Sequence, residues 1–328
     1  MQGFVVMSES TGLVYPLPWQ MKAWQKLVDL HIEGKLPHAL LLSGTDGSGI
    51  NRLALAFAQY VLCVQPSASG ACGNCSSCGL TIANTHPDFK LLAPEKTGGQ
   101  IKVDSVRNVV KFGHNTAQQG GYRVVVVAPA ESMNTFSANS LLKSLEEPGD
   151  KTLFVLISHM PIALLATIKS RCQWIKLPEP TRQEGKQWLA SVMSADVDVD
   201  ELLDLTNDQP IKALDFYSGG ELEQIQKIKS GLDQLAAGRN SALTLANAWA
   251  RWPLMLVVDG IYYWSVNWMK SSVINQTGNA RARQAMQKLV EQILQRRRNI
   301  LAGNNPNVQL LLEALMLDLG KVLTIARG

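Results

Sequence analysis

Short apolar runs alternate with helical patterns over the first half of the chain. The runs that have the length and aliphatic content of buried strands lie at residues 39–42, 89–92, 124–127, 153–157 and 174–177. Before and between them, apolar residues recur at helical spacing over residues 21–33, 51–62, 104–112, 137–145 and 163–169. This alternation predicts an α/β domain, in which helices cover both faces of a mostly parallel sheet. Functional groups in such sheets gather at the carboxyl ends of the strands.

The second half of the chain has helical periodicity almost to its end. Pro178 and Pro180 predict a hinge, and Ser218-Gly219-Gly220 predicts a second break. Beyond that break, helices are expected at residues 222–236, 242–249, 254–269, 281–301 and 308–326, with loops at 275–279 and 303–307. We therefore expect an α/β domain at residues 1–178, a small helical domain at 179–218 and an all-helical domain at 219–328.

Composition places the chain among ordinary globular proteins. Of its 328 residues, 46% are hydrophobic and 18% are charged, and the net charge of +4 permits contact with nucleic acid without arguing for it. No apolar run approaches the roughly 18–20 residues of a membrane span. The first residues lack the basic and apolar regions of a signal peptide. We expect a cytoplasmic protein that has no membrane partner.

A glycine-rich turn follows the first apolar run and precedes a helical stretch, as in a phosphate-binding loop. Gly44 and Gly49 keep the spacing of that loop, but Ile50 stands at the position of its lysine and Asn51 at the position of its Ser or Thr. The lysine would hold the outer phosphates and the hydroxyl would hold magnesium. Each lost charge-assisted contact is worth roughly 1.5–3 kcal/mol. The sequence therefore predicts a degenerate loop that does not bind ATP productively.

A second motif, the acidic residue expected at the end of the third predicted strand, is absent. In a working nucleotide hydrolase, a carboxylate at the end of this strand holds magnesium. Here the strand is followed by Ala128, Pro129 and Ala130, and Glu131 lies too far along to be assumed a substitute. Two damaged motifs at the correct separation indicate a nucleotide-hydrolase fold that has lost its own site.

Four of the five cysteines, Cys63, Cys72, Cys75 and Cys78, fall within sixteen positions. Two C-x-x-C steps share Cys75, and this spacing in a short insertion at 63–78 is typical of a four-thiolate structural zinc site. Disulfides and a redox pair are the alternatives, but a chain without a secretion signal is expected in a reducing compartment. Cys172 lies apart and is interpreted as a small buried hydrophobe.

Two charged groups have alternative interpretations. Glu146 and Glu147 end a helix before Pro148, as a solvated helix end or as a surface shaped for a partner. Arg171 is either an ordinary surface charge or a residue that points into the nucleotide site of a neighbouring subunit. Arginine suits the second task because its planar, permanent charge stabilises a transferring phosphate.

Aromatic and basic residues of the helical half also have two readings. The tryptophans are expected to pack in the core, since a base-stacking platform would need exposed rings among basic residues; they are Trp249, Trp252, Trp264 and Trp268. Arg296, Arg297 and Arg298 are interpreted as a solvated face or a subunit contact, with nucleic acid as the alternative.

Five segments in the same order carry a family resemblance. They are HALLLSG at 38–44, the cysteine insertion, THPDF at 85–89, ANSLLKSLEEP at 138–148 and LLATIKSRC at 164–172. Together they resemble the bacterial clamp-loader subunits of the replicative DNA polymerase holoenzyme, within the AAA+ superfamily. The resemblance covers about residues 15–180 of this chain. The missing lysine and missing acidic residues resemble the subunits of that family that do not hydrolyse ATP, and not its motor subunits.

The resemblance implies an ATPase-like domain, a small helical lid and a helical collar that closes a five-subunit ring. The implied partners are the gamma/tau ATPase and delta subunits, the sliding clamp, and primer-template DNA through the assembled complex. It implies that Arg171 is an arginine finger offered in trans, and that Ile211 or Lys212 lies near the second sensing arginine of the family. Lys102 and Lys143 lie where motor relatives contact DNA phosphates, or are ordinary surface lysines.

The sequence therefore favours a non-hydrolysing scaffold subunit of the sliding-clamp loader, active in DNA replication. No catalysis is expected from the isolated chain, which would be one subunit of a DNA-directed DNA polymerase holoenzyme. One alternative is an active AAA+ ATPase subunit that binds nucleotide through backbone amides alone. Another is a zinc-dependent nucleic-acid-binding module, but residues 64–77 contain no basic or aromatic side chain for that purpose.

Overall fold

The computed structural model describes residues 12–96, 99–119, 121–194, 196–274, 279–301 and 304–327. Residues 275–278 and Gly303, which belong to the two loops predicted in the helical half, lie outside this part of the chain. The chain divides into two compact units, the first ending at Pro180 and the second beginning at Thr181. The further division of the second unit at residue 218 stays a prediction.

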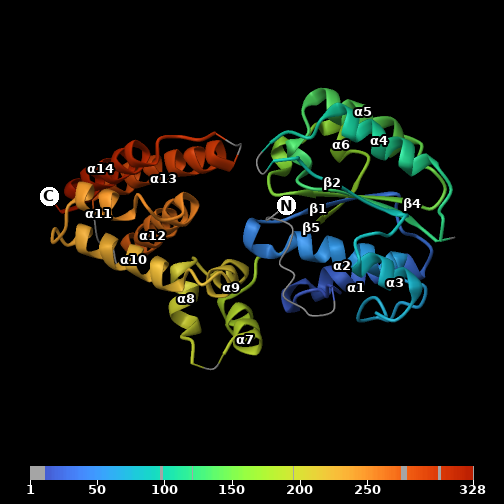
Figure 1. The fold of residues 1–328 in the computed structure, drawn as a ribbon, viewed down its shortest axis with the longest axis horizontal. Coiled ribbons are helices and arrows are strands. Elements are labelled where there is room, and N and C mark those ends of the chain that lie inside the picture. Colours follow the sequence, from blue (N-terminus) through green and yellow to red (C-terminus); the bar gives the residue numbers. More distant parts are fainter. Residues whose placement is uncertain are drawn as a thin grey trace. The chain divides into compact units, whose positions relative to one another are not determined.

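The first unit contains the predicted parallel sheet (Figure 1). Its strands run in the order β2-β3-β4-β1-β5, and each neighbouring pair is parallel. Their bounds are β1 Ala39–Ser43, β2 Phe89–Leu92, β3 Arg123–Val127, β4 Thr152–Ser158 and β5 Gln173–Lys176. Every residue of β1, β3 and β4 is buried, which explains why these strands read as continuous apolar runs.

Helices cover both faces of this sheet (Figure 1). One face carries α1 (Met21–Ile32), α2 (Ile50–Leu62) and α3 (Ser76–Ile82). The other carries α4 (Val103–His114), α5 (Thr135–Glu146) and the short α6 (Ala166–Lys169). Alternate strand residues enter two separate buried clusters, one on each face. The α/β prediction is therefore confirmed.

Single-turn 3-10 helices stand at several connections of the first unit. They are η1 (Pro18–Gln20) before α1, η2 (Asp46–Ser48) between β1 and α2, η3 (Ala130–Ser132) after β3 and η4 (Pro161–Ala163) after β4. Three of them follow the carboxyl end of a strand, so that edge of the sheet is built from tight turns.

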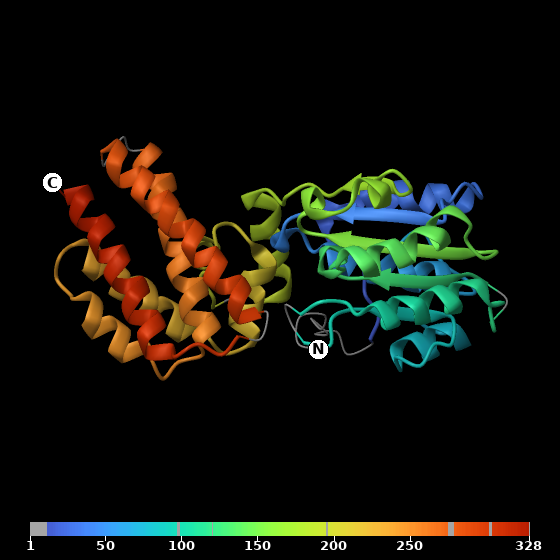
Figure 2. The ribbon, with the colours of Figure 1, turned by 90° about the horizontal axis from the view of Figure 1, so that it is seen from above.

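Among its described residues, the second unit contains helices and connecting turns and no strand (Figure 2). Its helices are α7 (Arg182–Val192), α8 (Val199–Leu205), α9 (Pro210–Ser218), α10 (Leu222–Ala236), α11 (Ala242–Trp249), α12 (Leu254–Ile274), α13 (Ala280–Leu301) and α14 (Val308–Arg327). The long helices α12, α13 and α14 pack side by side, and one buried cluster runs from α7 to α14. Among the described residues, no helix has the length and hydrophobicity that crossing a bilayer requires.

The THPDF segment has a structural role that its sequence did not reveal. The Asp88 carboxylate accepts hydrogen bonds from the backbone N–H groups of Gln118 and Gln119, each at 2.8 Å. It also lies 3.7 Å from Nε of Arg123, and both side chains are at most 3% exposed. Arg123 in turn donates to the carbonyl of Phe112 at the end of α4. This buried pair ties the start of β3 to the segment that follows α4.

Replacing Asp88 with alanine should lower the free energy of unfolding of the first unit by about 3–5 kcal/mol, because the substitution leaves the Arg123 charge buried and unpaired. The midpoint of the urea transition, compared with that of the unchanged chain, measures this loss. Asp104→Ala is the matched control, since its ion pair with Arg107 is exposed and should cost less than about 1 kcal/mol. Equal losses in the two variants would contradict this account of the buried pair.

Candidate functional site

The glycines of the degenerate loop are required by its geometry. Gly49 has φ of 71°, in the left-handed region that glycine adopts without strain. A Cβ on Gly44 would lie 2.4 Å from Oγ of Ser48, which itself donates to the carbonyl of Thr45. The loop therefore keeps the compact turn between β1 and α2 that its sequence predicts.

Two buried side chains hold this loop from the protein interior. Nε1 of Trp19 donates to the carbonyl of Ser48 at 2.9 Å. Nε2 of Gln20 donates to the carbonyls of Ser48 at 2.7 Å and Gly49 at 2.8 Å. Gln20 is fully buried and also accepts from the backbone N–H of Leu17. These bonds fix the loop from the protein interior.

Two residues stand where a working loop has its nucleotide-binding side chains. Ile50 faces the core, and the side-chain oxygen of Asn51 lacks a hydrogen-bond partner. Ile50 is 1% exposed and packs in the buried cluster between the sheet and the α1–α2 face. The side-chain oxygen of Asn51 is buried and makes no hydrogen bond within the described part of the chain. The N-terminus of α2 therefore carries neither the ammonium nor the hydroxyl that phosphate and magnesium require.

Glu131 lies closer to this edge of the sheet than sequence spacing suggested. Its Oε1 accepts from the backbone N–H groups of His159 at 2.9 Å and Met160 at 3.2 Å, just beyond β4. Nδ1 of His159 lies 3.2 Å from the carbonyl of Gly44. Glu131 thus joins the segments after β3 and β4 beside the degenerate loop. Its bond to two backbone amides leaves one carboxylate oxygen buried and without a hydrogen bond among the described residues.

Arg171 and Glu146 meet, although they are 25 residues apart in the chain. Nε of Arg171 donates to Oε1 of Glu146 at 2.7 Å, and Nη1 donates to the carbonyl of Thr167 at 2.9 Å. The Arg171 side chain remains 32% exposed. Glu146, read from the sequence as a helix end or partner surface, therefore orients the guanidinium at the molecular surface. Beside it, burial raises the pKa of the Cys172 thiol to about 12, as suits a residue packed against the core.

The two lysines proposed for DNA contact are both exposed. Nζ of Lys102 pairs with the Glu95 carboxylate at 2.7 Å, so its charge is partly neutralised within the chain. Lys143 lies in the last turn of α5, where a positive charge interacts favourably with the helix dipole. DNA contact through either lysine stays a prediction.

In the second unit, two basic side chains, Arg297 and Lys212, face one buried carboxylate. Asp259 on α12 is 5% exposed, and its Oδ1 pairs with Nε of Arg297 at 2.7 Å. Its Oδ2 lies 3.9 Å from Nζ of Lys212, which with Ile211 was expected near the second sensing arginine of the family. Burial raises the pKa values of Asp215 and Glu221 nearby. The Lys212 ammonium is therefore engaged inside its own unit, and Arg297 is a packing residue, not a free basic face.

The four clustered cysteines come together as the sequence predicts. Their sulfur atoms all lie within 4.8 Å of one another, and the described residues contain no disulfide. The closest separations are 3.6 Å for Cys63–Cys78 and 3.9 Å for Cys63–Cys75 and Cys72–Cys78. Tetrahedral zinc with Zn–S of about 2.3 Å places its sulfurs roughly 3.8 Å apart. The cluster therefore has the size and donor chemistry of a four-thiolate metal site.

Backbone amides favour the charged form of part of this cluster. The backbone N–H of Cys72 donates to Sγ of Cys63, and that of Cys78 donates to Sγ of Cys75 at the start of α3. Burial opposes ionisation of Cys75, but hydrogen bonds from the amides of Cys78 and Val64 outweigh it, so its pKa falls to about 6. Burial raises the pKa of Cys78 well above its usual range. A bound cation would offset this cost by stabilising the thiolates.

Comparison with known proteins gives one matching family model and several relatives. The model described as "DNA polymerase III, delta subunit" matches residues 19–181. A DNA polymerase III subunit delta′ from Pseudomonas aeruginosa is 37% identical, over 92% of this chain and 96% of its own. One from Yersinia pestis is 31% identical, over 92% and 94% respectively. These relatives match both units, which extends the similarity beyond the motifs that carried it in the sequence.

A solved structure supports the fold. The gamma subunit-related DNA polymerase III protein of Thermotoga maritima has a TM-score of 0.51 and 20% identity, and the alignment covers 94% of this chain and 98% of that one. At this identity, the likeness bears on the arrangement of elements alone.

A lysine at position 50 should destabilise the first unit and should not create a nucleotide-binding site. Ile50→Lys should lower the free energy of unfolding of the first unit by about 2–4 kcal/mol, because an ammonium would enter an apolar cluster without a partner. Urea denaturation measures the loss, with Ile50→Leu as a control that keeps a similar volume and should cost less than about 1.5 kcal/mol. A near-native Ile50→Lys variant that magnesium and ATP stabilise further would show instead that the loop still accepts nucleotide.

Proposed function

This chain belongs to the family of DNA polymerase III delta′ subunits, and from this premise we propose that it is a non-hydrolysing scaffold subunit of the bacterial sliding-clamp loader. Within that loader it would join the gamma/tau ATPase and delta subunits in a five-subunit ring, which acts on the sliding clamp and on primer-template DNA during replication. The isolated chain would then be no enzyme, although it belongs to a DNA-directed DNA polymerase holoenzyme.

The observation that carries this proposal is Ile50 buried at the lysine position. A nucleotide-binding loop needs a cation facing the phosphates, and here an apolar side chain faces the core instead. The bonds from Trp19 and Gln20 to the carbonyls of Ser48 and Gly49 hold the loop in the conformation that turns Ile50 into the core. The alternative of an active ATPase subunit would have to bind nucleotide through backbone amides alone.

We propose further that Arg171 acts in trans on the ATP site of an adjoining motor subunit. Two features support this role. The guanidinium is partly exposed, and Glu146 together with the Thr167 carbonyl holds it in one orientation. Such pre-orientation reduces the entropy lost when an arginine engages a transferring phosphate. On this proposal, Glu146 is a positioning residue that presents the finger at the surface.

Arg171→Ala should leave assembly of the loader intact and depress ATP turnover at the adjoining site by a factor on the order of 10³, the lower range for loss of an arginine finger. Gel filtration of the reconstituted complex tests assembly, and DNA-stimulated ATPase and clamp-loading rates test function. Arg171→Lys should fail to restore the rate, since an ammonium lacks the planar fork of donors.

Lys169→Ala is the matched control, because it removes a neighbouring positive charge from α6 without touching the proposed finger. It should retain nearly normal loading. An assembled Arg171→Ala complex that loads clamps normally would remove the trans role of Arg171 while leaving the scaffold role in place.

We propose that the cysteine cluster binds structural zinc through Cys63, Cys72, Cys75 and Cys78. The module around it has little core of its own, since among the described residues its buried cluster consists of Leu13 and Ala71 beside two of the cysteines, with Ile82 packed against it. Four thiolates leave no open coordination position for a substrate, so the metal would stabilise the fold of the insertion and take no part in a reaction. The spacing of the sulfurs and the amide bonds to them support this assignment.

Cys78→Ser should reduce bound zinc from about one ion per chain to less than a tenth of that, because oxygen replaces a thiolate in a buried site. Elemental analysis of protein purified without chelator measures the content. Cys172→Ser should retain the full metal content, as this residue lies outside the cluster. Unchanged zinc in Cys78→Ser, or none in the unaltered chain after exposure to zinc, would contradict the assignment.

A further inference from the structure

A line of buried hydrogen bonds leads from the cysteine module into the core of the first unit. It begins at Ser77, which directly precedes Cys78 on α3, and passes through His86 of the THPDF segment to Asp88. Ser77, His86 and Asp88 are 1%, 6% and 1% exposed. Polar groups buried to this degree are costly unless they are paired, so we expect every group along this line to have a defined partner.

The contacts of His86 determine which of its ring nitrogens carries the hydrogen. The backbone N–H of Asp88 donates to Nδ1 at 3.1 Å, so Nδ1 is the unprotonated nitrogen. Nε2 therefore carries the hydrogen and donates it to Oγ of Ser77 at 2.8 Å. Burial lowers the pKa of His86, against a smaller opposing effect of the Asp88 charge, so the ring is neutral at pH 7. One tautomer of the imidazole thus satisfies both neighbours.

Ser77 joins the two helix ends that carry Cys63 and Cys78. Because its Oγ accepts from His86, its own hydrogen is directed to the carbonyl of Leu62, to which it donates. Leu62 is the last residue of α2 and directly precedes Cys63, just as Ser77 directly precedes Cys78. The hydroxyl therefore ties the end of α2 to the start of α3. The sulfur atoms of Cys63 and Cys78 lie 3.6 Å apart, close to the roughly 3.8 Å of a tetrahedral zinc site.

The other end of this line is anchored in the sheet. Asp88 directly precedes β2, and its carboxylate pairs with the buried Arg123 at the start of β3. The carbonyl of Asp88 accepts from the backbone N–H of Val124 at 2.9 Å. The segment that carries His86 is therefore held by the sheet, whereas the cysteine module has little core of its own. His86 is the side chain that connects the two.

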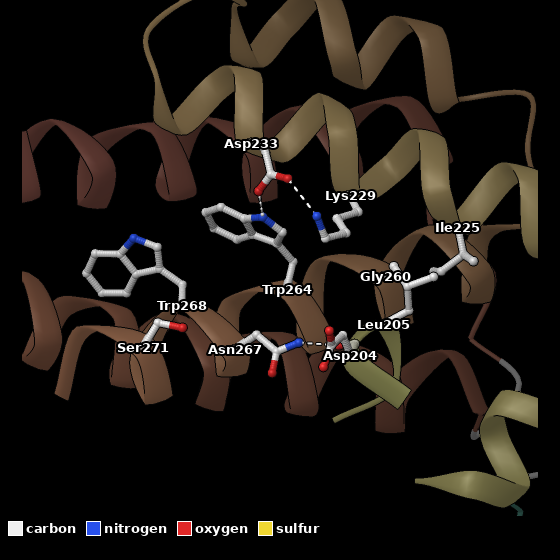
Figure 3. A pocket seen from close by; sticks show the side chains of 10 residues that line it. All are labelled: Asp204, Leu205, Ile225, Lys229, Asp233, Gly260, Trp264, Asn267, Trp268 and Ser271. Carbon is white, nitrogen blue, oxygen red and sulfur yellow. Dashed lines mark hydrogen bonds and ion pairs between the residues drawn. The ribbon is translucent and has the colours of Figure 1, made fainter. Parts of the chain in front are cut away.

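Polar side chains around a cavity of about 260 Å³ in the second unit provide a contrast (Figure 3). Nε1 of Trp264 donates to Asp233, which also pairs with Lys229. Nδ2 of Asn267 donates to the carbonyl of Asp204. Within the part of the chain that the structure describes, these bonds join α8, α10 and α12 to one another, and helix packing accounts for them. The line through His86 differs because it ends beside two cysteines of the candidate metal site.

We propose that His86 is a positioning residue for the four-cysteine metal site: its ring orients the Ser77 hydroxyl and thereby holds Cys63 and Cys78 at the separation that a bound metal ion requires. This inference rests on the proposed zinc site. His86 is not a ligand in this arrangement and acts through Ser77 on the backbone beside the cysteines. Such outer groups raise metal affinity because they reduce the freedom that the ligands lose when the ion binds.

The zinc affinity of the full chain, measured by competition with a chromophoric chelator of known affinity, tests this role. His86→Phe keeps an aromatic ring of similar size but removes both nitrogens, so it should raise the Kd for zinc at least about tenfold, equal to about 1.4 kcal/mol. His86→Gln keeps an N–H donor for Ser77 and should raise the Kd by less than about threefold. A residue that only filled space would give the opposite order, because phenylalanine resembles the imidazole ring more closely than glutamine does.

Two further variants separate the proposed path from general effects on the first unit. Ser77→Ala should weaken zinc binding about as much as His86→Phe, since it removes the hydroxyl through which His86 acts. It also removes only one oxygen atom, so it serves if His86→Phe does not fold. His114→Phe is the matched control, because Nε2 of His114 lies 3.2 Å from Oγ of Ser144 in the same unit, between α4 and α5. It should change the Kd by less than about twofold.

The tautomer of His86 gives a readout that is independent of zinc affinity. The chain contains 5 histidines, whose ring nitrogens are resolved by heteronuclear NMR, and the signals of His86 are assigned through His86→Gln. At pH 7, His86 should show a protonated Nε2 and an unprotonated Nδ1.

The proposal is overturned if His86 carries its hydrogen on Nδ1, if His86→Phe and Ser77→Ala bind zinc as tightly as the unaltered chain, or if His86→Gln loses as much affinity as His86→Phe. Absence of zinc from the unaltered chain is a separate result, which would overturn the four-cysteine assignment and this inference together.

Discussion

The hydrogen bonds from Gln20 to the carbonyls of Ser48 and Gly49 are the constraint on which the candidate site depends. They require a buried amide at the junction of η1 and α1, and they fix the turn that places Ile50 in the core. A loop held in this way from behind does not need phosphate to order its backbone. The same interaction therefore explains how the first unit keeps the shape of a nucleotide-binding fold after losing the charged groups that bind nucleotide.

The parallel sheet brings the changed residues of the candidate nucleotide site together at one edge. Because β1 and β4 are adjacent, the degenerate loop, Glu131 and His159 gather at one edge, where a catalytic site would otherwise form. Backbone groups and core contacts occupy that edge instead. Arg171, by contrast, keeps an exposed charge and a fixed orientation through Glu146. These contacts support the proposal that Arg171 acts on a neighbouring subunit and that this chain has no nucleotide chemistry of its own.

Features that depend on local pattern were predictable from sequence, and those that depend on packing between distant segments were not. The strands β1, β3 and β4 are continuous apolar runs because both faces of the sheet are covered, and the cysteine spacing alone indicated the cluster. Gln20, however, lies just before the predicted helix at 21–33 and has no pattern that marks it as buried, and nothing in the spacing of Glu146 and Arg171 shows that they pair.

Equilibrium binding of ATP with magnesium to the purified full chain tests the central claim most directly. Isothermal titration calorimetry with a motor subunit of a clamp loader as positive control would measure it. The account predicts no detectable binding at millimolar nucleotide, because the loop has no cation for the phosphates and is already ordered by the protein. Micromolar binding, or any turnover by this chain alone, would contradict the claim that the subunit works without a nucleotide of its own.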